Sequence, residues 1–192
     1  MHAFREVLKN YTTKTFTDDE IFSTIGMTWV DYTNIFLPGA DTQTLESFKA
    51  DFAESENHFM DIYAKPYDGV PELLKALKSK GYLTAVCSNS SARYITRVLK
   101  TLGLFELIDE IAPLQPGMTK RETLGILLEK VKPCRAVMVG DRIYDMQAAE
   151  HNGIGFVGCR YGYGKNELDH CENLAEKADE LLKKIEGLMQ NV

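Results

Sequence analysis

The chain has 192 residues, 44% of them hydrophobic and 26% charged, and this ordinary composition excludes collagen-like, mucin-like and disordered proteins. The net charge is −6 and there is no dense block of lysine and arginine, which argues against a nucleic-acid partner bound through its phosphates. No apolar run approaches the roughly 18 residues of a membrane span, so we expect no membrane partner.

Compartment and cysteine use follow from two simple patterns. Residues 1–6 lack the apolar core of a signal peptide, and we therefore expect the protein to be cytoplasmic. The four cysteines show no Cys-x-x-Cys spacing, so we expect free thiols rather than a disulfide or a zinc site. The sequence leaves the oligomeric state open.

Residues 1–66 are predicted to form an all-helical domain without strands. Aromatic and aliphatic residues recur there at three- and four-residue spacing, from Leu45 to Tyr63 for example, and such a stripe is typical of helix packing. Thr17 is a preferred N-cap residue, and Gly26 and Pro38 are helix stops. The predicted helices span residues 2–11, 17–26, 28–36 and 41–64.

Residues 67–192 are predicted to form an α/β domain, because short apolar runs alternate with helical segments of about ten residues. Continuous apolar strands indicate a parallel sheet covered by helices on both faces, and such sheets bind ligands at the carboxyl ends of the strands. The predicted strands span residues 82–88, 107–112, 136–140 and 154–159. The predicted helices span residues 69–80, 91–102, 120–131, 143–152 and 172–189.

Polar residues follow the first of these strands. Ser88 and Asn89 stand where the strand runs into a helix, and the N–H groups and dipole of a helix N-terminus favour an anion. Plain capping of the helix explains the same residues, since Ser and Asn are preferred caps.

A lysine begins the helix at residue 120. Thr119 and Glu122 form a capping-box pattern, which makes Lys120 the first helical residue. A cation is unfavourable at the positive end of a helix dipole, by up to about 1 kcal/mol, so an anionic ligand would explain it. The alternative is a solvated lysine offset by Glu122 or Glu129.

Two carboxylates follow the strand that ends at Gly140. Asp141 and Asp145 stand at one strand mouth, and pairs of hard oxygen ligands suit Mg²⁺. In the alternative interpretation Asp141 caps the following helix and Asp145 is a first-turn acid favoured by the helix dipole.

Taken together and in this order, these motifs closely resemble the haloacid dehalogenase (HAD) superfamily of phosphohydrolases, in particular its phosphoglycolate phosphatase-like branch. The resemblance implies that Ser88, Asn89 and Lys120 bind phosphate, that Ser88 and Lys120 act in catalysis, and that Asp141 and Asp145 bind Mg²⁺. It further implies a small phosphorylated metabolite as substrate. Residues 1–66 resemble the helical cap of the family, and residues 67–192 its Rossmannoid core.

One family motif has no counterpart among the 192 residues. The first core strand of the family ends in Asp-x-Asp-x-Thr, which supplies the nucleophile that becomes an aspartyl-phosphate and the general acid and base. Asp18, Asp61 and Asp109 lack the apolar strand or the second carboxylate of that motif. We therefore expect Mg²⁺ binding to be weak or absent and this chain to be catalytically inactive.

Three hypotheses about function remain open. In the first, the chain is a HAD-type phosphatase by lineage. In the second, it is a catalytically dead relative that binds a phosphorylated ligand or a protein partner. In the third, it is an enzyme of different chemistry, for which the Ser88-Asn89 pair is a weak argument. The resemblance also predicts a vacant central position between the strands that end at Ser88 and Gly140. Because unpaired buried backbone groups are costly, either these two strands pair directly or another segment or chain fills the position between them. We favour direct pairing, because residues 1–66 contain no spare strand-like segment.

Overall fold

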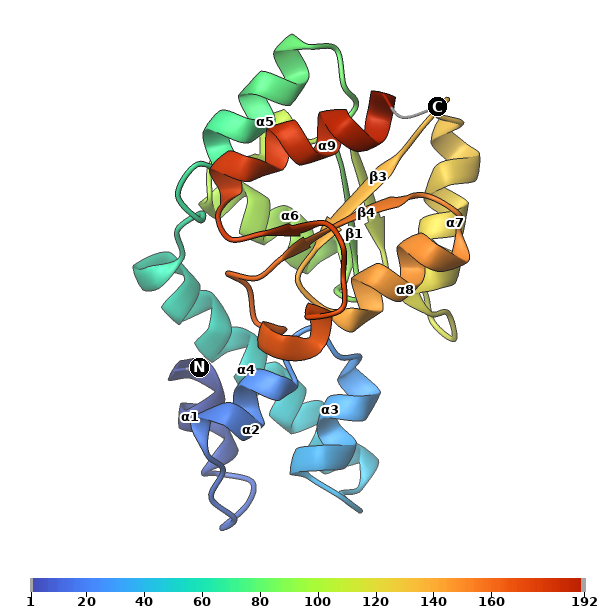
Figure 1. The fold of residues 1–192 in the computed structure, drawn as a ribbon. Coiled ribbons are helices and arrows are strands. Elements are labelled where there is room, and N and C mark those ends of the chain that lie inside the picture. The colour runs from blue at the N-terminus through green and yellow to red at the C-terminus, as the bar shows by residue number, and fades with distance from the viewer. Residues whose placement is uncertain (1, 191–192) are drawn as a thin grey trace. The chain divides into compact units, whose positions relative to one another are not determined.

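The computed structural model describes residues 2–190 and divides the chain into two compact units, the first ending at Lys65 and the second beginning at Pro66 (Figure 1). Among the described residues, no helix combines the length and the apolar character needed to cross a bilayer. Each unit has its own hydrophobic core and is described separately.

The first unit contains four helices, α1 (His2–Leu8), α2 (Asp18–Ser23), α3 (Trp29–Phe36) and α4 (Thr42–Tyr63). The predicted cap at Thr17 is confirmed, since its side chain accepts the Glu20 backbone N–H. Phe48 of α4 is fully buried, and its ring contacts Tyr11 and the α3 rings of Trp29 and Tyr32, so packing explains the middle of the aromatic stripe. Its end differs, because Ile62 and Tyr63 are exposed.

The second unit alternates helices and strands as the sequence predicts. Its helices are α5 (Val70–Ser79), α6 (Ala92–Thr101), α7 (Lys120–Val131), α8 (Ile143–His151) and α9 (Leu181–Gln190). Its strands are β1 (Ala85–Ser88), β2 (Glu110–Pro113), β3 (Val137–Gly140), β4 (Gly155–Cys159) and β5 (Leu174–Ala175). Short 3₁₀ turns lie at Phe105–Leu107, Lys165–Leu168 and Ala178–Glu180.

Helices cover both faces of the strands (Figure 1). Successive strand residues point to opposite faces, so neighbouring residues of one strand contact different helices. Val137 of β3 packs with the buried cluster formed by α5, α9 and β4. Its neighbour Met138 packs with the cluster formed by α7 and α8. This arrangement is the predicted parallel α/β unit with two helical layers.

The strands form two separate parallel ladders rather than one sheet. β1 pairs with β2, with Val86 opposite Ile111, while β3 pairs with β4 and β4 with β5. Among the described residues β1 and β3 share no ladder, so the expected direct pairing of these strands is wrong. Side chains of helices α5, α7 and α9 line the space between β1 and β3.

The predicted long helix over residues 172–189 is also wrong in its first half. Leu174 and Ala175 form β5, whose partners Gly158 and Cys159 lie at the carboxyl end of β4, and α9 begins only at Leu181. The Gly158 N–H donates to the Asn173 carbonyl, and this pairing with a buried strand outweighs local helix propensity.

Candidate functional site

The candidate site lies at the carboxyl ends of β1 and β3, where helices α6, α7 and α8 begin. The predicted capping box of α7 is present, because the Thr119 side chain accepts the Glu122 N–H while the Glu122 carboxylate accepts the Thr119 N–H. This box fixes Lys120 as the first residue of the helix. Its side chain is thereby directed across the gap toward α8.

Lys120 and Asp145 form the central ion pair of the site. The Lys120 Nζ donates to the Asp145 Oδ1 over 2.5 Å, and the two side chains are only 14% and 7% exposed. Desolvation makes such a pair costly to break, because the surviving charge would remain buried. Both residues are among the predicted site residues, and the structure brings their side chains into direct contact.

The second oxygen of Asp145 binds the backbone at the start of α8. Asp145 Oδ2 accepts the N–H groups of Asp141 and Arg142, each over 3.1 Å. Asp145 is an acidic residue of the first turn of α8, as the alternative interpretation predicts, and it satisfies N–H donors at the start of that helix. Gly140 allows this close approach, because a Cβ there would overlap the Asp145 side chain.

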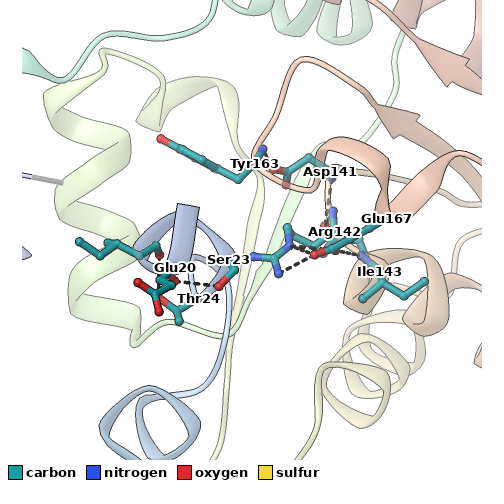
Figure 2. A network of polar contacts seen from close by, with 10 residues as sticks. Glu20, Ser23, Thr24, Asp141, Arg142, Ile143, Tyr163 and Glu167 are labelled. Carbon is teal, nitrogen blue, oxygen red and sulfur yellow. Dashed lines mark hydrogen bonds and ion pairs between the residues drawn. The ribbon is translucent and has the colours of Figure 1, made fainter. Parts of the chain in front are cut away.

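Asp141 faces a glycine-rich loop rather than the end of α8. Its Oδ2 accepts the Tyr163 N–H over 2.6 Å (Figure 2). A Cβ on Gly162 would overlap the Asp141 side chain, and one on Gly164 would overlap the Asp141 carbonyl oxygen. The two glycines therefore let the loop lie directly on Asp141. The N-cap of α8 is Arg142, so the alternative interpretation in which Asp141 caps the helix is wrong.

Arg142 and Glu167 form a second ion pair that the sequence did not single out (Figure 2). The Arg142 Nε and one terminal nitrogen donate to the Glu167 carboxylate over 2.8–3.2 Å, and the Ile143 N–H also donates to it. Desolvation raises the pKa of Glu167, but these hydrogen bonds outweigh it and hold the pKa below its ordinary value. The pair spans 25 residues, and no local spacing signals it.

Ser88 and Asn89 lie in the turn between β1 and α6. The Ser88 Oγ accepts the Ser90 N–H over 3.2 Å, and Ser91 caps α6 by accepting the Tyr94 N–H. Burial raises the pKa of the neighbouring Cys87 thiol to about 11, the charge of Lys120 lowers this pKa and the charge of Asp145 raises it. The tip of β1 therefore lies within electrostatic reach of Lys120 and Asp145.

The carboxylates as placed do not fit a Mg²⁺ site. Three of the four oxygens of Asp141 and Asp145 already accept hydrogen bonds, from Lys120 and from backbone N–H groups. Within residues 2–190 no cluster of three or more His, Cys, Asp or Glu side chains is arranged to hold a metal ion. Because Mg²⁺ requires about six oxygen ligands, the assignment of these residues to the metal stays a prediction.

The sequence matches a family of known enzymes. The family model described as haloacid dehalogenase-like hydrolase matches residues 1–159, which is most of the chain. The chain belongs to this family, and its similarity to phosphoglycolate phosphatases places it near that branch.

Several curated phosphatases are similar over part of their length. The phosphoglycolate phosphatase of Aquifex aeolicus is 34% identical over 62% of this chain and 61% of its own length. That of Psychrobacter arcticus is 26% identical over 76% of this chain and 68% of its own length. An N-acetylmuramic acid 6-phosphate phosphatase of Pseudomonas aeruginosa is 26% identical over 64% of this chain. The chain spans only 57% of that enzyme.

Solved structures share the fold. A protein of Clostridium acetobutylicum described as a predicted phosphatase superposes with a TM-score of 0.82 at 22% identity, over 97% of this chain and 89% of its own. CbbY of Rhodobacter sphaeroides, solved in complex with phosphate, superposes with a TM-score of 0.81 at 17% identity, over 96% of this chain and 90% of its own. Together with the α/β core and its helical appendage, these matches define a HAD-like fold.

Proposed function

We propose that this chain is a HAD phosphatase by lineage whose second unit binds the phosphate group of a small phosphorylated metabolite. The single observation that carries the proposal is the Lys120–Asp145 pair at the mouth of β1 and β3. An ammonium group has three N–H donors, so Lys120 can hold Asp145 with one and a phosphate oxygen with another. The relatives named for phosphoglycolate and for N-acetylmuramic acid 6-phosphate support this class of ligand.

In this proposal three groups share the phosphate. Lys120 supplies the positive charge, the Ser88 hydroxyl supplies a donor, and Asn89 with the turn before α6 supplies amide N–H groups. These groups stabilise charge on phosphate oxygens, which is the part of phosphoryl transfer that positioning and electrostatics accomplish. No step of the proposal passes through a metal ion, because three of the four carboxylate oxygens of Asp141 and Asp145 already accept hydrogen bonds.

We further propose that the 192-residue chain does not turn over phosphate esters at an appreciable rate. The sequence contains no Asp-x-Asp-x-Thr. The carboxylate beside Lys120, that of Asp145, is held by Lys120 and by two backbone N–H groups. Losing a covalent nucleophile commonly costs several orders of magnitude in rate. In this form the chain is a phosphate-binding protein.

Calorimetric titration with inorganic phosphate tests the binding, and Arg121 provides a matched control. Arg121 is the next residue of α7, is exposed, and donates to Gln147 instead of to a carboxylate at the strand mouth. Phosphate affinity is expected to fall at least about tenfold in Lys120→Ala and to stay within about twofold in Arg121→Ala, as expected for loss of one charge-assisted contact. Equal losses in both variants would show that phosphate binds by general surface charge.

Hydrolysis of p-nitrophenyl phosphate tests the second proposal. The purified chain is expected to show no turnover above a buffer blank. Turnover that survives purification and disappears in Lys120→Ala would overturn the inactive assignment while leaving the phosphate site in place.

A further inference from the structure

The C-terminal end of α8 carries the one Asn-Gly pair of the sequence, Asn152-Gly153. Asparagine is most prone to deamidation when glycine follows it, because glycine has no Cβ to shield its backbone nitrogen. That nitrogen attacks the amide carbon of the preceding side chain. The pair is therefore reactive by its sequence, and its surroundings in the fold set the rate of the reaction.

The same two residues end the helix. Asn152 is the C-cap of α8, and Gly153 follows it with a backbone φ of +64°. The Gly153 N–H donates to the Glu150 carbonyl over 3.1 Å. The Ile154 N–H donates to the Ala149 carbonyl, also over 3.1 Å. These two bonds form a Schellman motif, which favours glycine because a left-handed backbone is strained for other residues.

The Asn152 side chain joins α8 to α7, which packs beside it (Figure 1). Its Nδ2 donates to the Arg121 carbonyl of α7 over 2.9 Å and to the Ala148 carbonyl of α8 over 2.8 Å. A Cβ on Gly125 of α7 would lie 3.0 Å from the Asn152 Oδ1, so the amide fits closely between the helices. Both hydrogen bonds come from the nitrogen that deamidation expels.

We propose that Asn152 is a deamidation site, that opening of the C-terminal end of α8 controls its reaction, and that the product releases α8 from α7. The Gly153 nitrogen forms a bond to the side-chain carbon of Asn152. Ammonia leaves with the amide nitrogen and takes the Gly153 proton. Water then opens the succinimide ring at one of its two carbonyls and leaves an aspartate or a β-linked isoaspartate. The reaction needs no cofactor and does not depend on the phosphate site.

The folded geometry opposes the reaction at both reacting groups. The Gly153 proton is held by the Glu150 carbonyl, and the Asn152 amide is held by two further carbonyls. These bonds must break before the new bond forms, so the reaction starts from a locally opened helix end. An ionised carboxylate has no hydrogen to give to the Arg121 and Ala148 carbonyls. Its charge is also unfavourable at the C-terminus of a helix, so the joint between α7 and α8 is lost in the product.

Peptide mapping by mass spectrometry measures the reaction in the full chain, because deamidation replaces NH₂ by OH. Isomerisation at Asp68-Gly69 leaves the mass unchanged and does not interfere. In mildly alkaline buffer, Asn152 of the folded chain is expected to react at least about tenfold more slowly than in guanidinium chloride, since only the opened fraction reacts. Equal rates in the two conditions would overturn the control by folding. Absence of reaction in the unfolded chain would overturn the site itself.

Two helical glycines provide matched variants. In Gly125→Ala the new Cβ lies 3.0 Å from the Asn152 Oδ1, so the amide must shift, whereas a Cβ on Gly187 of α9 meets nothing. Both substitutions raise helix propensity, so a general gain in stability would slow deamidation in both variants. We expect Gly125→Ala to speed deamidation of the folded chain at least about threefold, through weaker hydrogen bonds, and Gly187→Ala not to speed it. A Gly125→Ala rate no higher than that of Gly187→Ala would contradict the role of the amide.

Hydrogen exchange tests the release of α8. Asn152→Asp carries the charge of one product, and Asn166→Asp makes the same change at an exposed position. Backbone amides in the last turn of α8 are expected to exchange at least about tenfold faster in Asn152→Asp and within about twofold of the parent chain in Asn166→Asp. The deamidated full chain, separated by ion exchange, provides the same comparison without a substitution. Equal exchange in the deamidated and parent chains would overturn the release of α8.

Discussion

The Lys120 ammonium donates to the Asp145 carboxylate over 2.5 Å, and the two residues occupy the first turns of different helices, α7 and α8. Asp145 benefits from its position at the positive end of α8, and its charge offsets that of Lys120 at the start of α7. The pair therefore ties together the tips of two βα units. The Asp145 carboxylate therefore explains why a lysine is tolerated at the N-terminus of α7.

Replacing the lysine should destabilise the fold. Lys120→Met is expected to lower the free energy of unfolding by about 3 kcal/mol, because it leaves Asp145 buried without its cation. Lys130 is the matched control on the same helix, since it pairs with Glu110 but its side chain is 63% exposed. Lys130→Met should cost at most about 1 kcal/mol. Urea unfolding of both variants measures the difference, and equal losses would contradict a buried pair.

The Arg142–Glu167 pair predicts a pH effect. The folded-state pKa of Glu167 lies below its unfolded value, so its stabilising contribution is complete above the unfolded pKa of about 4.3 and is lost as the pH falls through the folded pKa. Glu167→Gln should lower stability by about 2 kcal/mol at pH 7, by weakening hydrogen bonds to a charged group. The difference in the free energy of unfolding between wild type and Glu167→Gln should become smaller below about pH 4.

Denaturant unfolding at pH 7, 5 and 3 measures this difference in the free energy of unfolding. Glu172→Gln, which changes an exposed carboxylate, is the control and should leave the free energy of unfolding nearly unchanged at each pH. A gap between wild type and Glu167→Gln that is constant across the three pH values would show that the Glu167 charge does not act as described.

Two glycines should respond to alanine in opposite directions. In Gly164→Ala the new Cβ would overlap the Asp141 carbonyl oxygen, so the loop must move and the expected cost is about 1–3 kcal/mol. Gly187 lies within α9 with nothing near its added Cβ, and Gly187→Ala should stabilise the protein by up to about 1 kcal/mol through helix propensity. Thermal melts give both values, and a neutral Gly164→Ala would refute the close contact.

Magnesium should bind this chain weakly. Lys120 and backbone N–H groups occupy three of the four oxygens of Asp141 and Asp145, so the ion must compete for its ligands. Calorimetric titration with MgCl₂ is expected to give a dissociation constant above about 1 mM. Submillimolar affinity would contradict this and would indicate a further oxygen ligand in the chain.

Local sequence accounts for much of the second unit and for the start of its site. The Thr119–Glu122 capping box lies within four residues, so the sequence predicts the first residue of α7 correctly. The apolar runs before Ser88 and Gly140 predict β1 and β3, although β1 begins only at Ala85, because Tyr82 still hydrogen-bonds to Leu77 at the end of α5. The order of these motifs predicts the family.

Contacts between distant residues decided the rest. β5 exists because β4 pairs with it, and the Glu167 carboxylate reaches Arg142 through a fold that no short spacing encodes. The bond of Tyr163 to Asp141 depends on a loop that only two glycines allow to approach. The resemblance predicted a vacant position between β1 and β3, but only the structure decided that the two strands stay in separate ladders instead of pairing directly. Propensity and capping act within a few residues, whereas strand pairing and buried charge pairs are selected by the free energy of the whole core.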